Sequence, residues 1–183
     1  MANELIEKYA FEAVDLIRKK EVSSSELLKA SQERHIEVDE KVNALPHTFY
    51  DKALTKAKNL NIDSEGLNEK SLLGLPIAVK DYNDVAGVPT TFGSKIFRNN
   101  IPSKSDSTIA RLEQNGALPV AKSNVPEWAG GHTFNPVYGV TRNPFNKNKI
   151  AGGSSGGSSV ALATKQVWLA TGNDLGGSLR TPA

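Results

Sequence analysis

The sequence predicts an α/β fold, in which helices cover the faces of a β-sheet. Amphipathic helical patterns fill roughly the first 60 residues, short continuous apolar runs recur from residue 77 onward, and helical segments separate those runs. Such alternation of helices and buried strands is typical of a sheet with helices on its faces. A chain of 183 residues fits one domain and can bury a substantial core.

The N-terminal part, residues 1–70, is predicted to be a helical lead-in. Ala10, Val14 and Ile17 recur at helical spacing, which predicts a helix over residues 9–20. The serines at 23–25 offer an N-cap for a second helix that continues to about residue 38, and apolar positions predict a third helix over residues 50–59. Residues 61–70 are polar and are predicted to form a loop.

From residue 71 onward the pattern changes to short buried strands. The apolar run 77–79 predicts one strand, and the runs 118–121 and 167–170 predict two more. Asp106 can cap a helix that ends at Gly116, and a further helix is expected from about residue 157. Residues 124–148 contain three prolines and few periodic apolar positions, so this stretch is predicted to be mainly irregular.

The composition argues against several classes of function. The 22 basic and 20 acidic residues leave a net charge of +2, which gives no electrostatic case for binding nucleic acid or an anionic membrane. The chain has no cysteine, which excludes disulfides and thiolate chemistry. No apolar run approaches the roughly 20 residues that span a bilayer. We therefore expect a soluble, cytoplasmic protein.

Two clusters rich in glycine and serine invite a functional interpretation: GGSSGGSS at 152–159 and DLGGS at 174–178. The first has the composition of a flexible linker, but it runs directly into an apolar segment suited to burial. Its glycine spacing resembles a phosphate-binding loop, yet serines stand where that loop needs lysine and then serine or threonine. It also matches G-x-S-x-G, but a poor strand precedes it and all three histidines come earlier in the chain.

Serine chemistry served by a lysine base remains. A lysine acts as a base only when its pKa falls, and burial at the end of a strand has that effect because low dielectric disfavours the ammonium. Lys80 directly follows the apolar run 77–79 and is therefore the best candidate. The alternative is that Lys80 pairs with Asp81 and stays charged. The spacing of the residues does not decide between the two.

Three ordered motifs resemble the amidase signature family. They are GLPIAVKD at 74–81, GGSSGGS at 152–158 and GNDLGGSLRTPA at 172–183, and the segments around residues 106–109, 121–124 and 142–144 are similar to the family as well. The resemblance implies N-terminal helices followed by part of a mixed β-sheet covered by helices. It also implies that residues 71–183 form the first part of the family's core and that the chain is a single incomplete domain.

The resemblance also implies a Ser–cis-Ser–Lys triad. Lys80 would be the base, Ser154 the middle serine after a cis peptide bond, and Ser178 the nucleophile; the spacing to Ser178 favours Ser154 over Ser155. Ser155, Asp174 and Arg180 would support the site, the last two by bracing the loop. No metal and no cofactor is expected. The developing oxyanion would be held by the backbone N–H groups of Leu175, Gly176, Gly177 and Ser178.

These roles predict an amidase that hydrolyses small-molecule carboxamides through a seryl acyl-enzyme. One alternative is a glutamine-hydrolysing amidotransferase component that needs partner subunits, although the segment 128–132 (WAGGH) is more similar to the simple amide hydrolases. Another is a non-catalytic fragment. Family members are more than twice as long, so we expect an N-terminal portion with little activity alone. It would function with the missing C-terminal portion or as a homodimer.

Overall fold

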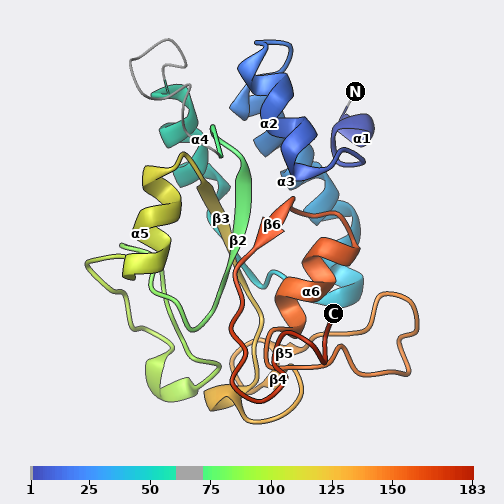
Figure 1. The fold of residues 1–183 in the computed structure, drawn as a ribbon. Helices are drawn as coiled ribbons and strands as arrows, with labels where there is room; N and C mark the ends of the chain where they lie inside the picture. The colour runs from blue at the N-terminus through green and yellow to red at the C-terminus, as the bar shows by residue number, and fades with distance from the viewer. Residues whose placement is uncertain (1, 61–71) are drawn as a thin grey trace.

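The computed structural model describes residues 2–60 and 72–183 and shows a four-stranded mixed sheet with helices packed around it (Figure 1). The strand order is β1-β3-β2-β6. β2 (Pro76–Lys80) runs parallel to β3 (Leu118–Ser123) and to β6 (Leu169–Ala170), whereas β1 (His47–Thr48) is antiparallel to β3. The predicted α/β fold with a mixed sheet is confirmed. The loop predicted at 61–70 and the boundary expected after residue 70 lie outside the described residues.

The helical lead-in contains α1 (Ala2–Leu5), α2 (Ala10–Arg18), α3 (Ser24–Val42) and α4 (Tyr50–Lys58). A reciprocal capping box starts α3: Ser23 Oγ accepts the N–H of Glu26 at 3.2 Å, and the Glu26 carboxylate accepts the N–H of Ser23 at 2.8 Å. The three predicted helices are confirmed, but α3 continues past residue 38 and ends at Asn43 in the left-handed conformation. The sequence pattern did not predict α1.

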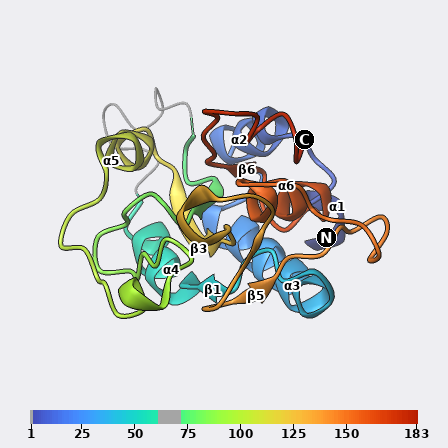
Figure 2. The ribbon, with the colours of Figure 1, turned by 90° about the horizontal axis from the view of Figure 1, so that it is seen from below.

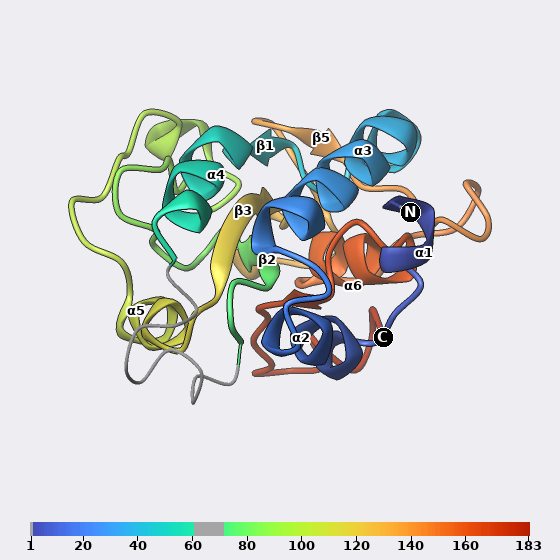
Figure 3. The same ribbon diagram turned by 90° about the horizontal axis from the view of Figure 1, so that it is seen from above.

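The central strand β2 separates two apolar clusters. Ile77 and Val79 pack in one cluster with Ile109 of α5 (Ser107–Gln114), whereas Ala78 packs in another with Val160 of α6 (Gly156–Ala163). Figure 3 shows α5 and α6 on opposite sides of β2. Because side chains alternate along a strand, the last residue of β2, Lys80, points to the same side as Ala78, toward α6.

The two ends of α5 show how neighbouring segments fix its position. Asp106 is the N-cap residue, as predicted, but its carboxylate accepts the backbone N–H of Asp84 at 3.0 Å and makes no capping bond to α5 itself. Gly116 follows the helix with φ of +92°, and a Cβ there would lie 2.8 Å from the backbone nitrogen of Leu73. Only glycine fits this position without strain.

The stretch between β3 and α6 is irregular, as predicted, apart from short elements: η2 (Glu127–Ala129), β4 (Phe134–Asn135) and β5 (Gly139–Val140). Buried amides organise it. Asn135 Nδ2 donates to Asn124 Oδ1 and to the Val125 carbonyl, both at 2.7 Å, and Asn124 Nδ2 donates to Thr141 Oγ1 at 2.9 Å. These loops and the C-terminal segment lie toward the same end of the molecule (Figure 1), which faces the viewer in Figure 2. The pattern did not predict β1, β4, β5, η2 or η1 (Lys95–Phe97).

No helix within residues 2–60 and 72–183 has the length and apolar content that a bilayer crossing needs.

Candidate active site

Lys80, at the end of β2, forms the centre of the candidate site. The residue has no solvent-exposed surface. Its Nζ donates to Ser154 Oγ at 2.7 Å, to Ser155 Oγ at 2.8 Å and to Asn173 Oδ1 at 2.5 Å. Three neutral oxygens therefore surround the nitrogen, and no carboxylate of the described residues forms a salt bridge with it.

Burial lowers the pKa of Lys80 to about 8, and the more distant charge of Asp174 opposes this shift only in part. The alternative interpretation, that Lys80 is held charged by a pair with Asp81, is wrong. The Asp81 carboxylate instead accepts the N–H and the hydroxyl of Thr91 and lies 3.5 Å from the Nζ of Lys122. The lowered pKa makes the neutral amine of Lys80 accessible nearer to neutral pH than in an ordinary lysine.

The first Gly-Ser cluster is a buried turn and not a flexible linker. Ser154 and Ser155 are each 1% exposed, and α6 begins directly after them at Gly156. The peptide bond between Gly153 and Ser154 is cis, at the position where the family resemblance places one. A Cβ on Gly153 would lie 2.2 Å from the carbonyl oxygen of Gly131, so the backbone of another loop packs against this turn.

The second cluster is shaped by the Asp174 carboxylate. It accepts the backbone N–H groups of Gly177 at 2.7 Å, Leu179 at 3.1 Å and Arg180 at 3.3 Å, and it forms two further bonds with the Arg180 guanidinium. The expected ion pair between Asp174 and Arg180 is thus formed. Hydrogen bonds from the guanidinium, above all, hold the pKa of Asp174 well below its usual range.

Ser178 lies beside the first cluster without a side-chain link to it. Its carbonyl oxygen accepts the N–H of Ser155 at 3.2 Å, whereas its hydroxyl makes no hydrogen bond with any described residue. The structure therefore brings together Lys80, Ser154 and Ser155, and it holds the backbone of Ser178 nearby. In this arrangement the Ser178 hydroxyl is not joined to Ser154.

The four backbone amides expected to hold an oxyanion differ in whether they already donate a hydrogen bond. The N–H of Gly177 donates to Asp174 Oδ1. The N–H groups of Leu175, Gly176 and Ser178 donate to no acceptor among the described residues. Three of the four amides are consequently free to bind another oxygen in this arrangement.

The sequence analysis missed three residues that contact Lys80. Asn173 accepts from its Nζ, Thr171 Oγ1 accepts its backbone N–H at 2.8 Å, and the ring centroid of Tyr82 lies 5.0 Å from the Nζ. Asn173 is part of the third motif, which could have singled it out. Neither Thr171 nor Tyr82 carries a comparable signal, because only the fold places them beside Lys80.

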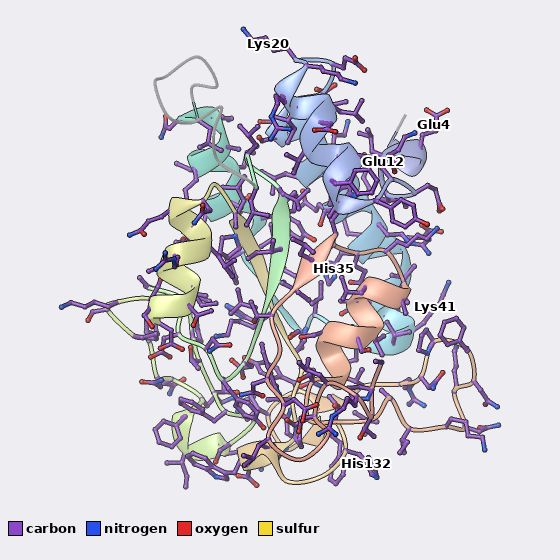
Figure 4. All side chains as sticks on the ribbon, in the orientation of Figure 1. Glu4, Glu12, Lys20, His35, Lys41 and His132 are labelled. Carbon is purple, nitrogen blue, oxygen red and sulfur yellow. The ribbon has the colours of Figure 1, made fainter. Side chains whose placement is uncertain are left out.

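The histidines of the described residues take no part in the hydrogen bonds of this site. Figure 4 shows His132 at the lower end of the molecule, where it is exposed, and the Nδ1 of His35 on α3 contacts Gln166 Oε1 at 3.0 Å. No histidine of the described residues hydrogen-bonds to Ser154 or Ser178. The described part of the chain also brings no three His, Cys, Asp or Glu side chains together in a way that could hold a metal ion.

Comparison with known families assigns this mixed fold, with its buried lysine and serines, to one family. A family model described as Amidase matches residues 26–183, and the chain belongs to this amidase signature family. The expected family assignment is confirmed.

The chain is similar to several individual members. It is 39% identical to a glutamyl-tRNA(Gln) amidotransferase subunit from Maridesulfovibrio salexigens, over 98% of this chain and 37% of that protein. A solved structure titled fatty acid amide hydrolase matches with a TM-score of 0.93 and 28% identity, over 100% of this chain and 32% of that one. The solved structure of a glutamyl-tRNA(Gln) amidotransferase subunit from Thermotoga maritima matches with a TM-score of 0.79 and 28% identity, over 97% of this chain and 36% of that one.

The chain thus spans about a third of the length of the relatives that it matches.

Proposed function

We propose that the protein takes part in hydrolysis of carboxamide C–N bonds, with Ser178 as nucleophile, Ser154 as proton relay and Lys80 as base. One observation carries the proposal: a buried lysine with a pKa of about 8 is hydrogen-bonded to Ser154 at 2.7 Å and has no carboxylate partner among the described residues. A serine hydroxyl is a weak nucleophile until a base takes its proton, and a desolvated lysine can supply that base near neutral pH.

The proposed acylation relays two protons while a C–O bond forms and a C–N bond breaks. Neutral Lys80 accepts the hydroxyl proton of Ser154, Ser154 accepts the proton of Ser178, and the Ser178 oxygen attacks the amide carbonyl carbon. The C–N bond then breaks as the proton returns through Ser154 to the departing nitrogen, which leaves as an amine or ammonia. Water hydrolyses the resulting acyl-serine by the same relay. The relay requires the Ser178 hydroxyl to turn toward Ser154.

The negative charge on the carbonyl oxygen needs donors that are already in place. The free N–H groups of Leu175, Gly176 and Ser178 are the candidates, and the Gly177 amide would join them only by leaving Asp174. The loss of one such donor reduces catalysis by about 10²- to 10³-fold in well-studied enzymes. We infer that the main role of Asp174 and Arg180 is to shape this loop.

The substrate class has two candidates. The expected one is a small linear carboxamide, and a solved structure titled fatty acid amide hydrolase shares the fold of this chain with a TM-score of 0.93. The second candidate is glutamine, hydrolysed with partner subunits. The 39% identity to a glutamyl-tRNA(Gln) amidotransferase subunit favours it, although segment 128–132 led us to expect a simple amide hydrolase.

Two measurements test the proposal. The first is covalent labelling of the purified protein with a fluorophosphonate, followed by peptide mass spectrometry. We expect an adduct on Ser178 that is lost in Ser178→Ala and in Lys80→Met, and an adduct that persists in Ser178→Ala would refute the assignment of the nucleophile. The second is release of ammonia or amine from linear amides and from glutamine, with and without candidate partner subunits. Glutamine turnover that needs the partners would select the second candidate.

A further inference from the structure

A second buried lysine lies close to Lys80 in the sheet. Lys122 of β3 has no exposed surface, and neither has Asp81, the residue that directly follows Lys80. The Nζ of Lys122 donates to Thr90 Oγ1 at 2.9 Å and to the carbonyl of Asn83, and it lies 3.5 Å from Asp81 Oδ1. The two hydrogen bonds of the ammonium therefore go to neutral oxygens, and the Asp81 carboxylate pairs with its charge at 3.5 Å.

The sheet separates this pair from the candidate active site. Lys122 stands opposite Val79 in the β2–β3 ladder, and Val79 packs on the α5 side of the sheet. Lys80 stands opposite Ser123, whose hydroxyl contacts Ser158 of α6 at 2.7 Å. Successive residues of a strand point to opposite faces, so Lys80 and Asp81 diverge. Lys80 meets serines on one side, and Asp81 meets Lys122 and Thr91 on the other.

We propose that Lys122 is a positioning residue that binds and neutralises the Asp81 carboxylate. The carboxylate therefore does not act as a counterion of Lys80. The sequence places a carboxylate directly beside Lys80, and an uncompensated negative charge at that position would favour the ammonium form of Lys80. Burial raises the pKa of the Asp81 carboxyl, and the charge of Lys122 together with the hydrogen bonds from Thr91 opposes that rise and favours the carboxylate. Among the described residues, Lys122 is the cation that pairs with this carboxylate. The importance of the Lys122–Asp81 pair for catalysis rests on the proposed function of Lys80 as base. The effect of the pair on the protonation of Lys80 does not depend on that function.

Other charged or titratable groups act on the same residues. On the Lys80 side, Asp174 is the acidic group whose charge reaches Lys80, and the Tyr82 ring centroid lies 5.0 Å from the Lys80 Nζ. On the Lys122 side, β1, the loop after β2 and the start of α5 contribute His47, Asp84 and Asp106. The pKa values of Tyr82 and Tyr138 are raised mainly by burial and further by the charge of Asp81. These groups remain in every variant described below, so their contribution is constant in the comparison.

The test is an NMR titration of the lysine side chains in protein labelled with ¹³C-lysine. The Lys80 signal is identified by its absence in Lys80→Met. In Lys122→Met, which removes the charge and keeps an unbranched side chain, we expect the titration midpoint of Lys80 to rise by about one pH unit or more. An unchanged or lowered midpoint would overturn the proposal, because a purely structural ion pair affects stability and leaves the titration of Lys80 in place.

The double variant Asp81→Asn/Lys122→Met is the matched control. It removes both charges, so the Lys80 midpoint should return to that of the unchanged protein, and a double variant shifted as far as Lys122→Met would also overturn the proposal. If Lys122→Met does not fold, as circular dichroism would show, Asp81→Asn supplies the test. It leaves Lys122 uncompensated and should lower the Lys80 midpoint, and no change or a rise would contradict the proposal.

This experiment separates the two proposals. The titration reports on Lys80 whether or not the protein hydrolyses amides. Failure of the proposed function would appear as absent labelling of Ser178 together with the expected midpoint shift. Failure of the role of Lys122 would appear as intact labelling with an unmoved midpoint.

Discussion

The backbone N–H of Ser155 donates to the carbonyl oxygen of Ser178 at 3.2 Å and so ties the two Gly-Ser clusters together. The same Ser155 contacts the Nζ of Lys80 through its hydroxyl at 2.8 Å. The backbone of the proposed nucleophile is therefore fixed to the turn that binds the proposed base. The proposed relay further needs a hydrogen bond between the Ser178 and Ser154 hydroxyls, which the described residues do not form in this arrangement.

The two serines that contact Lys80 should differ sharply in importance. Ser154→Ala removes the proton relay, and we expect labelling of Ser178 by a fluorophosphonate to slow by about 10²- to 10⁴-fold. Ser155→Ala removes the hydrogen bond from the Lys80 Nζ and a long one to the Asn173 carbonyl, and it keeps the backbone N–H that holds Ser178, so we expect a loss within about tenfold. The measurement is the labelling rate of each variant, with circular dichroism as a check of folding. Equal losses would show that Ser154 is not the relay.

The labelling rate should follow the protonation of Lys80. Only the neutral amine can accept a proton, and its fraction grows as the pH rises through the Lys80 pKa of about 8. The rate should therefore rise from about pH 6 and level off above about pH 9. A series of labelling rates over this range tests the prediction. A profile that rises around the ordinary lysine pKa of about 10.4 would mean that Lys80 is not the base.

The unfolding free energy should also depend on pH because of the lowered Lys80 pKa. The folded-state pKa of Lys80, about 8, is lower than the unfolded value, so the fold bears the cost of a buried ammonium at low pH. Between about pH 8 and pH 10.5 the folded lysine is neutral while the unfolded chain still binds a proton, which removes that cost. As the pH rises over this range, the unfolding free energy of the unchanged protein should therefore increase relative to that of Lys80→Met, by at most about 3 kcal/mol. Urea denaturation at several pH values measures the difference, and a constant difference would contradict the shift.

The start of α3 offers a test that is independent of catalysis. Ser23→Ala removes the acceptor for the Glu26 N–H and should lower the unfolding free energy by about 1 kcal/mol. Ser25→Ala is the matched control: this serine lies within the helix and its side chain makes no hydrogen bond with a described residue, so alanine should be neutral or slightly stabilising. Urea denaturation of both variants gives the comparison. Similar losses would mean that the cap contributes little.

Local patterns in the sequence were sufficient to predict the regular elements that bury a continuous face. The apolar run 77–79 and the capping serine at 23 each correspond to an element of the structure, β2 and α3. The two-residue strands β1, β4 and β5 are too short to show a period. They form because neighbouring segments supply hydrogen-bond partners, as Ala121 and Lys122 do for β1.

The sequence predicted those residues of the candidate site that lie in its motifs, but not the contacts between distant segments. Lys80, Ser154 and Asp174 stand in the ordered motifs, but the contact between the Lys80 Nζ and Asn173 depends on how two distant segments meet. The partner of Asp81 could not be read from the sequence at all. Lys122 lies on the neighbouring strand, and only the register of β2 against β3 brings it within 3.5 Å.

The Asp174 carboxylate should hold the loop of the second cluster without taking part in proton transfer. Asp174→Asn puts an amide where three backbone N–H groups find their acceptor, so we expect faster hydrogen exchange at Leu179 and Arg180 and a roughly ten- to hundredfold slower labelling of Ser178. Arg180→Met removes the guanidinium and leaves those three bonds, so its effects should be smaller. Because the pKa of Asp174 is lowered, the protection of these amides should persist below the ordinary carboxyl pKa of about 3.9 and disappear only at more acidic pH. Slow labelling with unchanged exchange would contradict a bracing role, because it would show that the carboxylate acts on the reaction itself.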